Sequence, residues 1–575
     1  MSAFYDIWIG ATSPTQVRLG NGEWENVSED AGYSLSTPAH GNATFVSTTT
    51  ASGYTLVVLG QFYESIDQVA LLQACVQYVG GKSTTFVDPA GHYILFLFNE
   101  TTRDWHVFTN RFGTYHAYWL NNGGQNVIST YFLGLARHSN NKSLDWEGIT
   151  GFFGLGFFPG TKTYLTSIQI LAPASHYHFD ASLNLVGSER YWNWAIASVP
   201  YNEVEHSAAL GKVLSNSLGH ATKGQRIALP ISGGLDSRML AGIVTQDDLG
   251  YKSIWAYSYG YSKKSAENSI ASRIAGTRKI QFESTVIPNY LFDRLHDITE
   301  AVELFQYVDG TRQACMQNEI ATNADAVVGG HWGDVWMDST LIEGHDLFPI
   351  FEKKVLKRGR QWLFSEIANN FQKDPESYLR EHFTSTVKEY NHLENAGLKF
   401  KAYKTDQWSF RWTLASIRMY QSAAFPVLPF YDKNVADLLL TVPEEILNGR
   451  KMQIDFIKKY HPDLARITWQ EYGRDLYSYQ KFNNRNIAYR AASKLLRIVS
   501  KEKNITRNWE VFYMNPEGRR KLEALLIDNP QLDDFVGKKK RQELINDLYR
   551  NPTGANGYTV SMLLTFGTAL KRIFD

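Results

Sequence analysis

Ser232-Gly233-Gly234-Leu235-Asp236-Ser237 is the stretch that decides the fold, because it joins a predicted strand over 226–231 to a predicted helix that runs on through residue 243. Two adjacent glycines let the backbone turn its N–H groups toward an anion. Two serine hydroxyls and the N-terminus of the helix add further donors. The pattern predicts a polyphosphate-binding loop, and the alternative is an ordinary strand-to-helix turn without a ligand.

The chemistry of this loop is set by its acidic residue, Asp236. The Walker pattern G-x-x-x-x-G-K-S/T is absent, and a carboxylate stands where a lysine would reach a terminal phosphate. A carboxylate beside phosphates indicates a bound Mg²⁺ ion. Such a loop resembles the pyrophosphatase loop of the ATP pyrophosphatase superfamily, whose members cleave ATP between the α and β phosphates. The expected cofactors are therefore ATP and Mg²⁺.

Composition excludes several classes of protein. Lys+Arg and Asp+Glu both total 58 in 575 residues, so no global charge favours nucleic acid or a membrane. The only cysteines, Cys75 and Cys315, provide neither a disulfide framework nor a zinc cluster. No basic leader precedes an apolar core, and no segment offers about twenty consecutive apolar residues, so we expect a cytoplasmic location. The length predicts about two or three domains.

The pattern of predicted secondary structure changes near residue 200. Before it, short runs rich in Val, Tyr, Phe and Trp alternate with turns, which predicts a mostly β region with one helix over 66–78 and a connector at 191–194. The predicted strands are 55–59, 93–98, 105–109, 117–120 and 127–130.

After residue 200, strands and helices alternate as in βαβ units. This alternation predicts a parallel sheet with its ligands at the carboxyl ends of the strands. Beyond about residue 345 the sequence is almost wholly helical. The predicted helices are 203–217 and 266–276, and the predicted strands besides 226–231 are 253–259, 279–286 and 326–329.

With both halves in view, the chain resembles the asparagine synthetase family. The motifs are the loop already quoted, Gly330-His331-Trp332-Gly333-Asp334, and Pro429-Phe430-Tyr431-Asp432 followed by Val442-Pro443, with weaker landmarks at 59–63 and 110–113. The resemblance implies an α/β fold: an N-terminal, mostly β sandwich of the N-terminal-nucleophile type over 1–195, then a parallel-sheet adenylating domain with a largely helical C-terminal region over 203–575.

The resemblance also implies a binding site for magnesium and ATP. Asp334 stands at the family's metal-binding aspartate, while His331 and Val335 stand where glutamates would, so Asp236 and Asp334 are the expected metal ligands and catalytic carboxylates. The alternative role for Asp334 is a helix cap. The residues expected to bind ATP are Ile231, Ser232, Gly233, Gly234, Leu235, Asp236, Ser237, Tyr257 and Gly330; Ile231 and Tyr257 could equally be packed strand ends.

The N-terminal half departs from the family at the glutaminase site. A family glutaminase uses an N-terminal cysteine as nucleophile, but residue 2 is Ser2, and Leu59 stands where an oxyanion-binding asparagine is expected. We therefore expect that glutamine is not hydrolysed. An N-terminal serine nucleophile is the alternative.

The family's catalytic lysine has no clear counterpart. Its Arg-x-Lys pattern is missing, so Lys451 is the predicted catalytic cation and Lys481 the second choice; both could be surface lysines. Arg411 and Arg418 share a helix face that would suit phosphate or a carboxylate, or they are surface cations with buried stems. A basic segment over 481–507 is predicted to be an outer helix, with an acidic acceptor or an anionic membrane as alternatives.

These features predict an ATP-dependent amide-forming ligase that releases AMP and pyrophosphate. Its substrates would be a small-molecule, peptide or sugar carboxylate and an amine donor, with no nucleic acid. Lasso-peptide cyclases, β-lactam synthetases and amidating enzymes of surface polysaccharide pathways are relatives within this class. A catalytically inactive binding or scaffold protein is the alternative outside it, and membrane contact and a homodimer are left open.

Overall fold

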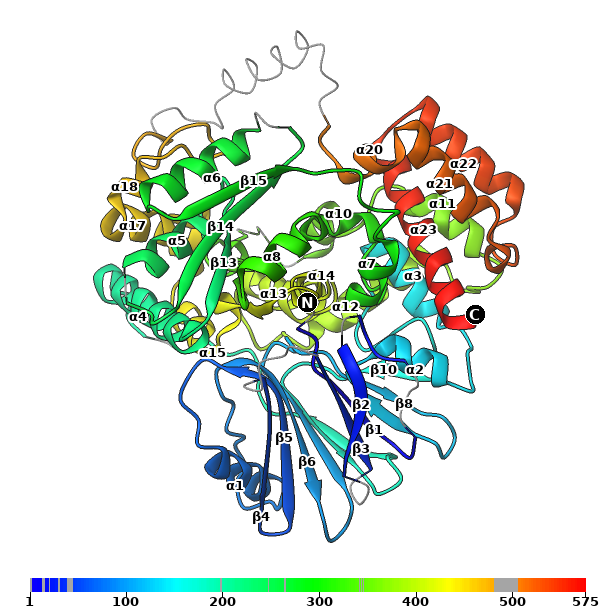
Figure 1. The fold of residues 1–575 in the computed structure, drawn as a ribbon, viewed down its shortest axis with the longest axis horizontal. Helices are drawn as coiled ribbons and strands as arrows, with labels where there is room; N and C mark the ends of the chain where they lie inside the picture. Colours follow the sequence, from blue (N-terminus) through cyan, green and yellow to red (C-terminus); the bar gives the residue numbers. More distant parts are fainter. Residues whose placement is uncertain are drawn as a thin grey trace.

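The computed structural model describes residues 3–12, 16–19, 21–28, 32–38, 45–196, 199–246, 248–262, 265–340, 342, 344, 346–479 and 505–575. Two antiparallel sheets lie on one side of the molecule, and a parallel sheet surrounded by helices lies on the other (Figure 1). The fold is thus α/β, with antiparallel sheets first, a parallel sheet next and a helical C-terminal part, as the sequence predicts.

The N-terminal strands form two sheets with the orders β10-β8-β9-β1-β3-β2 and β12-β11-β7-β6-β5-β4. The strands are β1 (Asp6–Ile9), β2 (Asn21–Ser28), β3 (Tyr33–Pro38), β4 (Val46–Ala51), β5 (Tyr54–Phe62), β6 (Gly91–Asn99), β7 (Trp105–Thr109), β8 (Tyr118–Leu120), β9 (Val127–Ser129), β10 (Ile168–Ile170), β11 (Ser175–Phe179) and β12 (Leu185–Arg190). The helices of this region are α1 (Gln68–Val79), α2 (Phe132–His138) and α3 (Trp146–Leu155).

Strand β5 shows why this region folds as a layered structure. Its residues Leu56 to Leu59 are all buried, because successive side chains point to opposite faces and both faces are covered. Val57 and Leu59 join a core with Ile7 of β1 in the other sheet. Leu56 and Val58 join a second core with α1. The continuous apolar run therefore belongs to a strand that lies between two packed layers.

The parallel sheet has the order β15-β14-β13-β16-β17. Its strands are β13 (Arg226–Pro230), β14 (Ser253–Gly260), β15 (Gln281–Val286), β16 (Ala326–Val328) and β17 (Phe425–Val427). The chain leaves β13 toward β14 and β15, and later returns to the other side of β13 as β16. The order of strands therefore reverses between β13 and β16, which is where open α/β sheets bind ligands.

Helices cover the parallel sheet and fill the C-terminal part. Around the sheet lie α4 (Glu203–Thr222), α5 (Asp236–Gln246), α6 (Ala266–Thr277), α7 (Leu295–Val302), α8 (Gln317–Asn323) and α9 (Gly333–Trp336). Then follow α10 (Phe348–Lys354), α11 (Arg360–Ile367), α12 (Pro375–Lys388), α13 (Ala396–Tyr403), α14 (Leu414–Gln421), α15 (Lys433–Leu439), α16 (Glu444–Leu447), α17 (Lys451–Tyr460) and α18 (Pro462–Ala465), and finally α20 (Asn508–Tyr513), α21 (Pro516–Ile527), α22 (Lys538–Arg550) and α23 (Gly554–Phe574).

The segment at 191–194 is neither helix nor strand, as predicted for a connector, and it is anchored in the protein, because Trp194 is 2% exposed and its Nε1 donates to Asp406 at 3.0 Å. The described part of the chain beyond 345 is helical and irregular apart from the three-residue strand β17, in agreement with the prediction of an almost wholly helical region. Ser2 and Lys481, with most of the predicted basic helix, lie outside the described residues. The domain limits 1–195 and 203–575 stay a prediction.

Buried cations join the two halves of the chain. Arg18 pairs with Asp6 at 3.0 Å and with Glu303 at 3.3 Å, and Arg418 also pairs with Glu303 at 2.5 Å. Arg411 donates to the carbonyl oxygen of Gly160 at 3.0 Å. Arg411 and Arg418 are therefore neither surface cations nor free anion-binding groups. They satisfy buried acceptors at the contact between the β sheets and the helices.

No helix in the described part of the chain combines the length and the apolar character needed to cross a membrane.

Candidate active site

The loop after β13 is closed by its own serines. Ser232 N–H donates to Ser237 Oγ at 3.0 Å, and Gly234 N–H donates to Ser232 Oγ at 3.2 Å. Asp236 opens helix α5, so the loop leads directly into a helix N-terminus. Leu235 is fully buried and anchors the turn. This arrangement agrees with an anion-binding turn at the carboxyl edge of the sheet.

The loop after β16 packs directly on the first loop. A Cβ added to Gly330 would lie 3.3 Å from Asp236 Cβ, and one added to Gly333 would lie 2.8 Å from Asp236 Oδ1. Glycine is therefore required here by close approach to Asp236. The structure thus brings together the two motifs that the sequence singled out, 232–237 and 330–334, across the reversal of strand order.

Asp334 lies on the first turn of α9, and its side chain is exposed. It interacts electrostatically with Asp236, since the Asp334 charge raises the pKa of the Asp236 carboxyl. The larger cause is burial: together the effects raise the pKa of Asp236 to about 6 although Arg450 lowers it. The Asp334 carboxylate is therefore close enough to act electrostatically on Asp236.

Arg450 and Gln453 hold the Asp236 carboxylate. Arg450 Nη2 and Gln453 Nε2 both donate to Asp236 Oδ1, the second at 2.9 Å. Gly449 and Arg450 have φ values of 65° and 62°, a left-handed turn before helix α17 that aims the Arg450 side chain at the loop. Sequence reasoning missed both residues, although the Asn448-Gly449 turn is the signal that marks this conformation.

Lys451 lies on the outer face of α17. Its side chain is 51% exposed, and its Nζ donates to Asp455 Oδ2 at 2.7 Å and lies 3.6 Å from Glu203. The neighbouring residue, Arg450, takes the place beside Asp236 that was predicted for Lys451. The geometry therefore does not bring Lys451 to the phosphate loop. Arg450 reaches the loop from the left-handed turn before α17, whereas Lys451 is the first residue of the helix and its side chain is directed toward Asp455 and solvent.

A buried arginine fixes a further segment on the loop. Arg238, fully buried on α5, donates to the carbonyl oxygens of Ile467 at 2.8 Å and of Thr468 at 2.7 Å. Gln470 packs on Gly233, and its backbone N–H donates to Gly233 O at 3.2 Å. No sequence motif pointed to Arg238 or Gln470.

Lys404 is a basic residue that the structure brings beside the second loop. It begins a π-helical segment, η4 (Lys404–Thr413), a form of helix that is frequent at functional sites. The next residue, Thr405, accepts a hydrogen bond from Trp332 Nε1 at 3.0 Å. Burial lowers the pKa of Lys404 to about 8, and the Asp334 charge acts in the opposite direction. A lysine with this pKa is mostly protonated at neutral pH.

Two of the residues predicted to bind ATP, Ile231 and Tyr257, have buried side chains that pack near the carboxyl edge of the sheet. Ile231 is 2% exposed, and its N–H donates to Tyr257 O at 2.8 Å. The Tyr257 ring is fully buried, with the Trp255 ring centroid 5.1 Å away. Their side chains therefore support the edge of the sheet.

The N-terminal half offers no thiolate near its strands. Cys75 is fully buried in α1, and burial raises the pKa of its thiol to about 12. Leu59 is fully buried in the core between the sheets. A neutral thiol and an apolar side chain cannot replace a reactive cysteine and a hydrogen-bond donor.

The donor set fits magnesium held together with a phosphate. No group of three or more His, Cys, Asp or Glu side chains arranged for a metal occurs among the described residues. Mg²⁺ takes one or two protein carboxylates and fills its other positions with phosphate oxygen and water. Asp236 and Asp334 are the two carboxylates of this site that would hold such an ion.

Comparisons with known proteins add little to this geometry. No family model and no curated protein matches the chain. Among solved structures, a glutamine phosphoribosylpyrophosphate amidotransferase from B. subtilis, complexed with ADP and GMP, shows 10% identity and a TM-score of 0.19, covering 45% of this chain and 77% of that one. A U34-tRNA thiolase, NcsA from Methanococcus maripaludis, with its 4Fe-4S cluster, shows 12% identity and a TM-score of 0.21, covering 54% and 84%. At these TM-scores the similarity carries no argument, so the function is inferred from the residues of the chain itself.

Proposed function

We propose that this protein is an ATP-dependent amide-forming ligase that activates a carboxylate as an acyl-adenylate, releases pyrophosphate, and passes the acyl group to an amine with release of AMP. The observation that carries the proposal is the contact between the two loops, in which Gly330 and Gly333 pack on Asp236 at the reversal of strand order. An acidic phosphate loop at this place suits magnesium and a polyphosphate better than a bare phosphate.

Binding of the triphosphate would use the N–H groups of 232–237 and the N-terminus of α5. Asp236 and Asp334 would hold Mg²⁺, which supplies charge neutralisation to the departing pyrophosphate when it is bound. Arg450 would add a guanidinium beside the same oxygens, because its side chain reaches the Asp236 carboxylate. The leaving group's charge is thus spread over several fixed donors.

The acyl-transfer step needs a cation near the phosphate and the carbonyl oxygen. Lys404 is our candidate, since it lies next to the loop that carries Asp334 and Lys451 faces solvent. A preorganised cation of this kind typically contributes about 10²–10³ in rate.

The amine would be ammonia or an amino group of a substrate. This part of the proposal rests on Leu59, which is buried where a donor is required, and on Ser2 in place of cysteine. The carboxylate could come from a small molecule, a peptide or a sugar acid, as in asparagine synthetases and their relatives.

Exchange of labelled pyrophosphate into ATP tests the proposal. Purified protein is incubated with ATP, Mg²⁺ and a panel of carboxylates: aspartate, short peptides and uronic acids. We expect exchange with one class of carboxylate, and its loss in Asp236→Asn. If the protein binds Mg-ATP tightly but no carboxylate in the panel supports exchange, the alternative of a catalytically inactive binding or scaffold protein is favoured instead.

A further inference from the structure

The C-terminal helix lines a cavity that the proposed reaction does not use. The cavity has a volume of about 740 Å³ and is bordered by α2, α7, α21 and α23. None of the residues of the two site loops lines it, and Figure 1 shows α23 on the opposite side of the molecule from α5. Its volume lies within the range of about 300–1,000 Å³ that small-molecule sites occupy.

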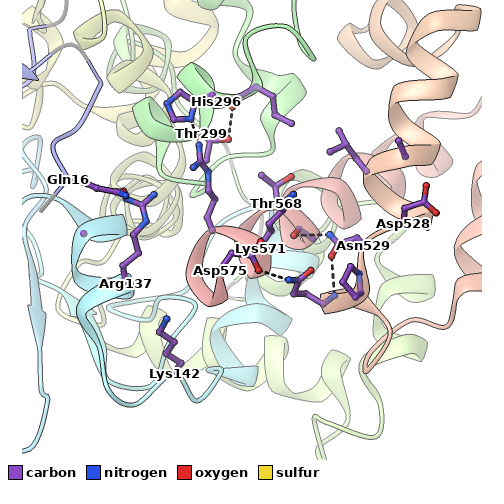
Figure 2. A pocket seen from close by; sticks show the side chains of 18 of the residues that line it. Gln16, Arg137, Lys142, His296, Thr299, Asp528, Asn529, Thr568, Lys571 and Asp575 are labelled. Carbon is purple, nitrogen blue, oxygen red and sulfur yellow. Dashed lines mark hydrogen bonds between the residues drawn. The ribbon is translucent and has the colours of Figure 1, made fainter. Parts of the chain in front are cut away.

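Part of the cavity wall is cationic. The basic residues that line it are Arg137, Lys142, Lys571 and Arg572, and Figure 2 shows Arg137 and Lys142 on the same side. Arg137 and Arg572 share a single buried carboxylate, Glu300, at 3.1 Å and 3.6 Å. Two guanidinium groups against one carboxylate leave positive charge on this part of the wall.

The two lysines add charge that carboxylates do not neutralise. Lys142 Nζ donates to the carbonyl oxygen of Ile573 at 2.6 Å, so its partner is a neutral group. Lys571 Nζ makes no hydrogen bond or ion pair with any residue that the structure describes. Of the acidic side chains on the cavity wall, Asp528 pairs with Lys538 at 3.3 Å, whereas Asp575 Oδ1 accepts from the neutral amide of Gln531 at 2.6 Å and keeps its negative charge. The four cations still outnumber Glu300 and Asp575.

Apolar side chains line other parts of the cavity. They are Ala524 and Leu525 of α21 and Leu295 of α7. Figure 2 shows Arg137 and Lys142 on one side of the cavity and Asp528, at the end of α21, on the other. Gly134 of α2 and Gly567 of α23 also line the cavity.

We propose that this cavity binds a small amphipathic organic anion, with its acidic group between Arg137, Lys142, Lys571 and Arg572 and its apolar body against Leu295 and Leu525. The charges and the apolar side chains together determine which ligand fits. A neutral lipid would not pair with the cations, and inorganic phosphate would leave the apolar side chains exposed to water. The proposal does not depend on the ligase activity.

Calorimetric titration of the whole protein with decanoate tests the proposal. The uncharged comparison ligand is decanol, and inorganic phosphate is the ligand without an apolar body. We expect decanoate to bind at least about tenfold more tightly than either, because a charge-assisted contact and apolar burial act together.

Two variants test whether decanoate binds in this cavity. Lys571→Glu reverses a charge on the cationic part of the wall and should weaken decanoate binding about tenfold. Thr568→Phe fills the space from the face of α23 and should abolish it. The matched control is Lys539→Glu on α22, whose side chain is 91% exposed and does not line the cavity. Circular dichroism checks that each variant is folded.

The proposal is overturned if decanoate fails to bind, if decanol or phosphate binds equally well, or if Thr568→Phe and Lys571→Glu bind decanoate as the wild type does. None of these outcomes involves ATP, so a failure here leaves the proposed ligase function untouched.

Discussion

Adding one methyl group at Gly333 should weaken nucleotide binding without unfolding the protein. Gly333 begins helix α9 and has no left-handed φ value, so an alanine costs little in backbone conformation. Its Cβ would lie 2.8 Å from Asp236 Oδ1, and 2.9 Å from a carbon of the Phe430 ring. Both neighbours must move.

The size of the effect follows from these contacts. An ordinary contact needs roughly 3.4 Å or more, so the carboxylate must retreat by about half an ångström. Magnesium demands near-ideal geometry from its ligands and tolerates such a shift poorly. Loss of one charge-assisted contact costs about 1.5–3 kcal/mol, which corresponds to about 10- to 100-fold in affinity.

Two other glycines make a graded series. Gly330→Ala brings a Cβ to 3.3 Å from Asp236 Cβ and should have a smaller effect. Gly276→Ala, on helix α6, has no atom within 4 Å and should have none. The assay is calorimetric binding of α,β-methylene-ATP with Mg²⁺, an analogue that cannot be cleaved at the bond in question. The reasoning is refuted if Gly333→Ala binds the analogue as the wild type does, or if Gly276→Ala is equally impaired; thermal melting shows whether a variant is folded.

Three further predictions follow from the same contacts. Lys404→Met should lose about 10²–10³ in turnover while still binding Mg-ATP, whereas Lys451→Met should lose little; a reversed order in steady-state assays would return the role to Lys451. Incubation with glutamine should release no glutamate above the background of a Ser2→Ala variant, and release that disappears in this variant would establish a serine nucleophile. Burial raises the pKa of Asp309 to about 6, so its contribution to stability is present below the unfolded pKa of about 4 and is lost as the pH rises through 6. Asp309→Asn should therefore increase the free energy of unfolding at about pH 7.5 by up to about 3 kcal/mol, with a matching rise in melting temperature, and should have much less effect at about pH 4. An equal effect at both pH values would contradict the claim that Asp309 is a buried, charged carboxylate at about pH 7.5.

The pattern of strands was predictable where both faces of a strand are buried. The apolar runs of β5, β6 and β13 stand out in the sequence because every side chain has a packed neighbour. Strand β17 has only three residues, and its place in the sheet depends on pairing with β16, a contact that no local pattern encodes. Trp194 likewise looks like part of a loop until its partner Asp406, far along the chain, is known.

The site was predictable in its loops but not in its cations. The glycines and serines of 232–237 dictate a turn by local chemistry alone. The choice between Arg450 and Lys451 depends on the left-handed turn before α17, which directs Arg450 to Asp236 and leaves Lys451, the first residue of the helix, paired with Asp455. Lys404 comes from an element with no motif, and only the packing of Thr405 against Trp332 brings it to the site.

The fate of the phosphates in ATP tests the central claim most directly. Once pyrophosphate exchange has identified an accepted carboxylate, the protein is incubated with that carboxylate, an amine and ATP labelled at either the α or the γ phosphate. Our account predicts that the α label appears in AMP and the γ label in pyrophosphate, and that Asp236→Asn forms neither product. Appearance of ADP and orthophosphate would contradict adenylation and the assignment of the loop that follows β13.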